Sequence, residues 1–80
     1  DEDLKEVYRK GYNEKLEEFQ VFLQKQQEKG NIRADVDAKT LAQNLMALST
    51  DITMQLVIGI DESKVHETWT NSVAAILEKH

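Results

Sequence analysis

The segment between two glycines, residues 30–59, constrains this chain most, because it predicts a long helix that is apolar on nearly every side. At about 100° per residue, residues 38–58 form an apolar stripe, a second row beside it and a third group opposite. The stripe is Leu41, Leu45, Leu48, Ile52 and Leu56, the row is Ala42, Met46, Thr53 and Val57, and the opposite group is Ala47, Met54 and Ile58. Such a helix belongs in a protein interior. Two other helices of an 80-residue chain cannot surround it, so it needs a partner chain or protein outside these residues.

An amphipathic helix is predicted on each side of this segment. The first covers about residues 3–29, and the helix dipole favours its acidic start at Asp1, Glu2 and Asp3. Its apolar face is Leu4, Tyr8, Tyr12, Leu16, Phe19, Phe22 and Leu23. The last helix starts after Asp61, and its apolar face is Val65, Trp69, Val73, Ile76 and Leu77. Short connections predict antiparallel neighbours, so the expected fold is one all-α, three-helix antiparallel domain over residues 1–80.

Glycine and aspartate mark the expected helix ends. Gly30 and Gly59 can adopt the left-handed conformation that commonly ends a helix. Acidic and hydroxyl side chains can accept hydrogen bonds from the free N–H groups at a helix start. The candidate caps are Asp35 or Asp37 for the second helix and Asp61 or Ser63 for the third. Gly11 lies within the first helix, where it costs up to ~1 kcal/mol against alanine, and it either admits a close neighbour or leaves space.

Charge argues against nucleic-acid binding by this chain. Ten Lys and Arg against fifteen Asp and Glu give a net charge of −5, whereas gripping phosphates requires a positive face. The basic residues near the start alternate with glutamates, which is typical of a solvated helix face with i,i+4 pairs. They are Lys5, Arg9, Lys10 and Lys15, among Glu2, Glu6, Glu14, Glu17 and Glu18.

Neither a membrane span nor a signal peptide is predicted. No apolar run approaches the ~18 residues that a span needs, and the start DEDLKEVY is acidic without an apolar segment. The absence of cysteine excludes disulfides and thiolate metal sites. This absence says little about the compartment, and the cytoplasm is the default expectation.

No pattern predicts an enzyme, a metal site or a cofactor. Glu62 and His66 stand four residues apart, but no HExxH pattern supports them, so His66 is better explained as a surface or interface residue. Ser49, Thr50 and Asp51 are adjacent on a helix, where neighbours do not face each other. No serine-nucleophile motif or phosphate-binding glycine loop occurs.

Aromatic residues on the first helix have two interpretations. Tyr8, Tyr12 and Phe19 line one side, either as plain core or as one wall of a ligand pocket, since pockets are apolar with a few polar groups. Polar residues of the second helix could orient such a ligand, satisfy one another or face water. They are Asn44, Ser49 and Thr53.

The order of features from residue 20 onward resembles a known family. The first helix ends at a glycine, an arginine and acids follow, and a second helix closes at another glycine before a last amphipathic helix. The features are Gly30, Arg33, Asp35, Asp37, Leu41-Ala42, Ala47-Leu48 and Gly59. Their spacing resembles the C-terminal regulatory domain of TetR-family transcriptional regulators.

The resemblance implies an effector-sensing and homodimerisation domain of a regulator, expected to be a repressor. In that family the last two helices pair with their counterparts in a dimeric four-helix bundle, and the preceding helix lines a pocket for a small effector, here apolar or amphipathic. The expected pocket residues are Tyr8, Tyr12, Phe19, Met46 and Ser49. The expected dimer interface is Leu48, Ile52, Gln55, Trp69, Val73, Ile76 and Leu77.

Two departures from the family pattern accompany this interpretation. The helix-turn-helix head and the helices that would complete the pocket are absent, so the chain resembles a fragment that does not itself bind DNA. Many relatives carry a glycine near Asp51, whose carboxylate here could face solvent or bond to Gln55 or Thr70. The alternative function is a self-standing helical protein–protein interaction module. An upstream basic helix-turn-helix would favour the regulator, and a native start codon at Asp1 would favour the module.

Overall fold

The computed structural model describes residues 2–79, which form three helices and no strand. Helix α1 spans Glu2–Glu28, α2 spans Ala38–Val57 and α3 spans Glu62–Leu77. The all-α class is confirmed, and the helix bounds agree with the predicted ones to within one residue. Asp1, expected at the acidic helix start, and His80 lie outside the described residues.

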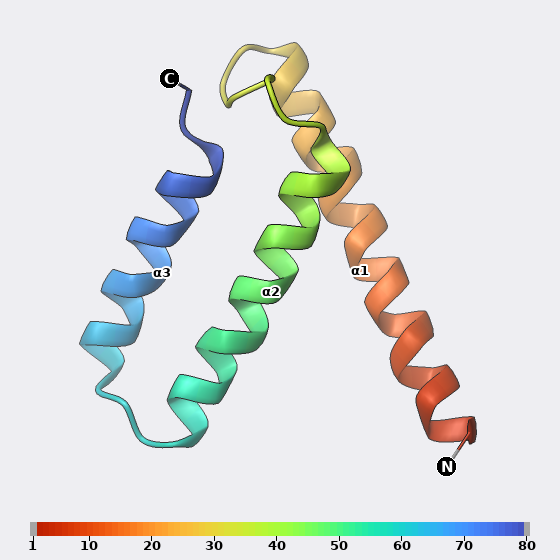
Figure 1. Ribbon diagram of the computed structural model, residues 1–80, viewed down its shortest axis with the longest axis vertical. Helices are drawn as coiled ribbons and strands as arrows, with labels where there is room; N and C mark the ends of the chain where they lie inside the picture. Colours follow the sequence, from red (N-terminus) through yellow and green to blue (C-terminus); the bar gives the residue numbers. More distant parts are fainter. Residues whose placement is uncertain (1, 80) are drawn as a thin grey trace.

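The three helices form a thin layer with α2 in the middle. In Figure 1, α1 rises, α2 descends beside it and α3 rises on the other side. Within residues 2–79, α1 and α3 each contact α2 and do not contact each other. The Cα atoms extend over 41 × 33 × 14 Å, so the shortest dimension is about one third of the longest. The broad sides of α2 are therefore not covered by another helix of the described chain.

Glycines end α1 and α2 in the same way. Gly30 and Gly59 have positive φ angles of 76° and 86°. After α1, the N–H groups of Gly30 and Asn31 donate to the carbonyls of Gln27 and Gln26 at 3.0 and 2.9 Å. The same pair of bonds follows α2, where Gly59 and Ile60 donate to Leu56 and Gln55. These are Schellman motifs, and they confirm the predicted role of both glycines.

Aspartates cap α2 and α3. Asp37 Oδ1 accepts a hydrogen bond from the Thr40 N–H at 3.1 Å, and Asp61 Oδ1 accepts one from the Ser63 N–H at 3.0 Å. Of the two candidates at each helix start, Asp37 and Asp61 are therefore the caps. Asp35 has a different role, because it pairs with Arg33.

Loss of the Asp37 cap is expected to lower the melting temperature in a pH-dependent way. Hydrogen bonds from the Thr40 side chain and backbone hold the pKa of Asp37 below its usual value. This stabilisation is complete above the unfolded pKa of about 3.9 and is lost as pH falls through the lower folded pKa. D37A should lower Tm by roughly 4 °C at pH 7. Thermal melts from pH 7 to 2 should show this gap closing at acid pH.

The Asp37→Asn variant is the matched control, because asparagine caps helices without a titrating group. D37N should keep most of the wild-type Tm at pH 7. A D37A gap that stayed constant down to pH 2 would contradict the assigned role of the carboxylate.

The hydrophobic core lies where the last half of α1 meets the first half of α2. Its buried members are Leu23, Ala38, Leu41, Ala42 and Leu45. Partly buried residues from all three helices and the α1–α2 connector pack against them. These are Leu16, Phe19, Ile32, Val36, Val73, Ile76 and Leu77. This cluster thus occupies one end of the helix layer, next to the α1–α2 connector, whereas Val65 near the start of α3, which is 3% exposed, is buried apart from it.

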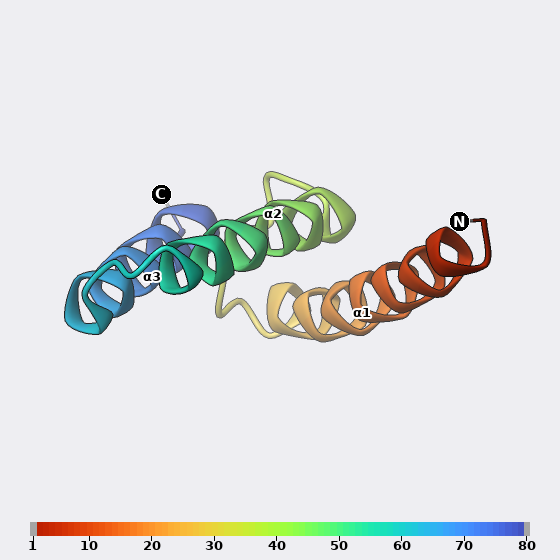
Figure 2. The ribbon, with the colours of Figure 1, turned by 90° about the horizontal axis from the view of Figure 1, so that it is seen from below.

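The first half of α1 has no such support. Leu4, Val7, Tyr8 and Tyr12 are 47–70% exposed, and a Cβ at Gly11 would meet no atom within 4 Å. The space left at Gly11 is therefore open. Figures 1 and 2 show the cause, since α1 and α2 approach at one end and diverge toward the start of α1. The predicted apolar face of α1 is buried or half-buried only at Leu16, Phe19 and Leu23, and Phe22 is 56% exposed.

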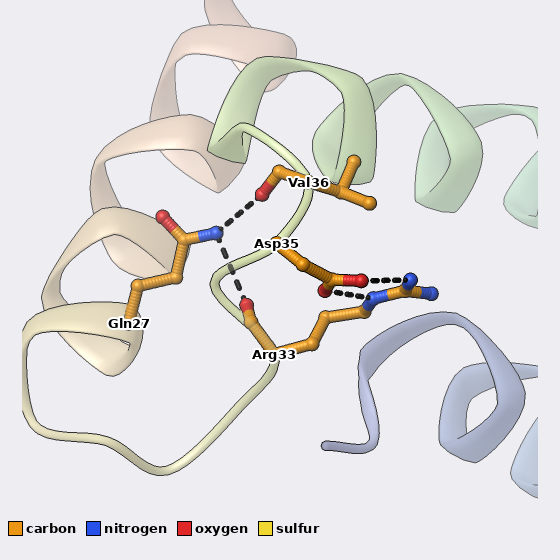
Figure 3. A network of polar contacts seen from close by, with 4 residues as sticks. All are labelled: Gln27, Arg33, Asp35 and Val36. Carbon is orange, nitrogen blue, oxygen red and sulfur yellow. Dashed lines mark hydrogen bonds and ion pairs between the residues drawn. The ribbon is translucent and has the colours of Figure 1, made fainter. Parts of the chain in front are cut away.

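Side-chain and backbone bonds fix the connector between α1 and α2 (Figure 3). Gln27 Nε2 donates to the Val36 and Arg33 carbonyls at 2.8 and 3.2 Å. The Arg33 guanidinium makes two 2.8 Å bonds to Asp35, which raise the pKa of Arg33. The Arg33 N–H donates to the Leu77 carbonyl at 2.9 Å. The connector thereby joins the end of α1 to the end of α3.

The chain exposes more surface than a compact monomer of its size. Its accessible area is 6003 Å², whereas a folded monomer of 9.2 kDa exposes about 4,900 Å². The radius of gyration is 14.4 Å, against about 12 Å for a compact 80-residue domain. The excess, roughly 1,000 Å², includes large apolar side chains such as Val57 and Ile58, which are 75% and 66% exposed.

Candidate functional site

An open groove lies between α1 and α2, beside the core and at the point where the two helices begin to diverge. It offers about 350 Å³. The lining residues are Lys15, Phe19, Met46, Ser49, Thr50 and Thr53. Three of the five predicted ligand-binding residues, Phe19, Met46 and Ser49, are thus brought together from two helices.

The hydroxyl groups of the groove differ in their availability. Thr50 Oγ1 donates to the Met46 carbonyl at 3.2 Å, and Thr53 Oγ1 donates to the Ser49 carbonyl at 2.9 Å. Such bonds back to the preceding turn occupy the hydroxyl proton. The half-buried Ser49 hydroxyl makes no hydrogen bond within residues 2–79. Ser49 therefore has a hydroxyl proton to donate to a bound molecule.

One charged residue, Lys15, lines the groove. Its Nζ lies 3.2 Å from Glu18 Oε2, and the two side chains are 56% and 68% exposed. Sequence reasoning assigned Lys15 to a solvated face and did not include it among the site residues. The available signal was its position four residues before Phe19, which places both on adjacent turns of one helix side.

The two tyrosines of the predicted pocket lie elsewhere. Tyr8 and Tyr12 are 70% and 47% exposed and do not line the groove. They share a helix side with Phe19, but they belong to the first half of α1, and this half of the helix diverges from α2 (Figure 1). Asn44 is exposed and is also absent from the groove lining.

The residues predicted for a dimer interface lie on α2 and α3, and all are half-buried. Val73, Ile76 and Leu77 already pack against the core of their own chain. Gln55 Nε2 donates to Asp51 Oδ2 at 2.7 Å. Of the alternatives considered for the Asp51 carboxylate, which were solvent, Gln55 and Thr70, the structure therefore shows the bond to Gln55. Trp69, Leu48 and Ile52 each retain exposed surface in the single chain.

A larger volume of about 540 Å³ lies against the outer side of α1, around Val21 and Phe22. All of its lining residues belong to α1. The surface of a single helix is convex and cannot enclose a ligand by itself. We therefore interpret this volume as solvent beside the helix.

The described part of the chain has neither a metal-binding cluster nor a membrane-spanning helix. Residues 2–79 contain no group of three or more His, Cys, Asp or Glu placed to hold a metal ion. His66 is exposed on α3. No helix in this range combines the length and apolarity that a membrane span requires.

The fold and the groove define an all-α domain with a thin helix layer and a small amphipathic groove beside its core. Comparison with known proteins found no matching family model, no matching curated protein and no matching solved structure.

Proposed function

We propose that this chain is the effector-sensing and homodimerisation domain of a TetR-like transcriptional regulator, expected to be a repressor. The sequence resemblance around Gly30, Arg33 and Gly59 suggests the family. The observation that carries the proposal is the surface excess of roughly 1,000 Å² in a layer whose central helix is apolar on nearly every side. No DNA binding is assigned to these residues, whose net charge is −5.

A second copy of the chain is the partner that best fits the uncovered surface. A stable interface buries about 800 Å² per partner, close to the excess. A twofold pairing of α2 and α3 would form an antiparallel four-helix bundle and leave no open end. Trp69 is the proposed anchor, because tryptophan is enriched among the residues that dominate interface energies. Leu48, Ile52 and Gln55 would face the partner from α2.

The groove between α1 and α2 is the proposed effector site. Its size falls within the 300–1,000 Å³ of small-molecule pockets. An effector there would contact Phe19 on α1 and Met46 on α2 together. Binding would therefore change the angle between α1 and the proposed dimerising pair, α2 and α3. Through this change, effector binding in the groove would alter the position of α1 relative to the dimer interface.

Sedimentation equilibrium of the 80-residue chain tests the dimer. We expect a dimer at ~100 μM, well above the dissociation constant of a stable dimer. Trp69→Glu should split it or unfold the chain, because an unpaired buried charge costs about 3–5 kcal/mol. Circular dichroism separates these two results. Val7→Glu, at a 66% exposed position on α1, is the control and should remain dimeric.

A wild-type chain that stays folded and monomeric at ~100 μM would contradict the proposed function. The chain would then be better described as a helical module for binding other proteins.

A further inference from the structure

We infer that the groove binds a small amphipathic carboxylate, with its apolar chain between Phe19 and Met46 and its carboxylate beside Lys15. This inference rests on the proposed sensing function and adds the chemical class of the effector. It is drawn from the lining of the groove, which combines apolar walls, one cation and an available hydroxyl.

The groove is apolar at one end and polar at the other. Phe19 packs against the core cluster, so the end of the groove beside Phe19 is the apolar, less hydrated end. Lys15 lies one turn earlier in α1, away from the core. On α2, Thr53 lies two turns beyond the buried Leu45 and is likewise remote from the core. A ligand with a tail and a polar head therefore fits with its head at the Lys15 end.

The charge of the groove selects an anion. Lys15 is the charged group of its lining, in a chain whose net charge is −5. The Lys15–Glu18 pair is more than half exposed on both sides, and such surface pairs contribute little to stability. Glu18 can therefore give up the ammonium to a ligand carboxylate at little cost. At this open end the carboxylate would keep part of its hydration.

Ser49 supplies a second contact for the head group. Its hydroxyl makes no hydrogen bond within residues 2–79 and can donate to a carboxylate oxygen. The Thr50 and Thr53 protons are already used by backbone carbonyls. Ser49 and Lys15 are thus the two donors available to a carboxylate in the groove.

Calorimetric titration of the 80-residue chain with three eight-carbon probes tests the inference. The probes are octanoate, octan-1-ol and octylammonium, each below its aggregation concentration. Octanoate should bind at least fivefold more tightly than octanol, and octylammonium most weakly. Lys15→Gln should remove the preference for octanoate and leave octanol affinity unchanged. Lys10→Gln, which removes an exposed charge outside the groove, should keep the preference.

The Phe19→Ala variant separates the two possible failures. If octanol binds as tightly as octanoate and F19A weakens both, the groove binds ligands and only the carboxylate preference is wrong. If octylammonium binds most tightly, the inference is also overturned. If no probe binds the folded wild-type chain, both the inference and the sensing part of the proposed function fail. Sedimentation equilibrium tests the other part of the proposed function, homodimerisation, independently of these titrations.

Discussion

Replacing Leu41 by alanine is expected to lower the free energy of unfolding by about 3–4 kcal/mol. Leu41 is 1% exposed and lies in the cluster where α1 meets α2. Truncation removes buried methyl groups and leaves a cavity. Few neighbouring side chains can move in to fill this cavity, because the helix layer is thin. A domain of 80 residues has roughly 4–12 kcal/mol of total stability. Urea denaturation followed by circular dichroism should therefore show a large fall in the midpoint.

The matched control is the same substitution at Leu56, on the same helix but 48% exposed. L56A should cost less than ~1 kcal/mol, because much of that side chain is already in water. Equal losses in L41A and L56A would contradict the burial of Leu41 in the cluster at the connector end of α2. Both variants should be compared at one protein concentration, since dimerisation would add to apparent stability.

Replacing Gln27 by glutamate is expected to cost about 3 kcal/mol, because two connector carbonyls lose their donor. Gln27 Nε2 donates to Val36 and Arg33, and the site is half-buried. A carboxylate at this position has no proton to donate and faces two carbonyl oxygens. Thermal melts should show Tm falling by about 10–20 °C in Q27E at pH 7.

Acid should partly rescue Q27E and so identify the missing donor as the cause. The two carbonyls favour the neutral carboxyl, which raises its pKa above the usual ~4.3. The penalty is therefore present above the folded pKa and shrinks as pH falls through it, because the protonated carboxyl can donate again. Gln24→Glu, on an exposed side of α1, is the control and should change stability by less than ~0.5 kcal/mol at pH 7. A pH-independent difference between Q27E and Q24E would refute the hydrogen-bonding role.

Local sequence signals were sufficient for the helices and their ends. Gly30 and Gly59 adopt positive φ angles as expected, because glycine has no Cβ to oppose that conformation. Asp37 and Asp61 cap the helices that follow them. The sequence did not decide between Asp35 and Asp37, since that choice depends on Arg33, whose guanidinium binds Asp35.

Helix periodicity does not show where along its length a helix loses its neighbour. Tyr8, Tyr12 and Phe19 share one side of α1, so all three were assigned to one pocket wall. Only Phe19 lies where α2 is still close, and the tyrosines are exposed. The divergence depends on the angle at which two helices pack, which the spacing of apolar residues in one helix does not determine.

Two polar residues were missed because their roles depend on tertiary contacts. Lys15 belongs by sequence to a charged helix face, yet it lines the groove. Gln27 follows the buried Leu23 by one turn, which places it on the inner side of α1. That position was a usable signal, since a polar residue on a buried stripe needs a hydrogen-bond partner.

Because α1 diverges from α2, a small rotation of α1 about its packed end would produce a larger displacement at its start. If Leu23, which is 2% exposed, is taken as the fulcrum, Phe19 lies about 6 Å along the helix axis and Glu2 about 32 Å. A ligand that wedges Phe19 away from Met46 would therefore move the start of α1 roughly five times as far as it moves Phe19. Because residues 2–15 of α1 are all exposed, little of the described chain packs against them to damp that movement.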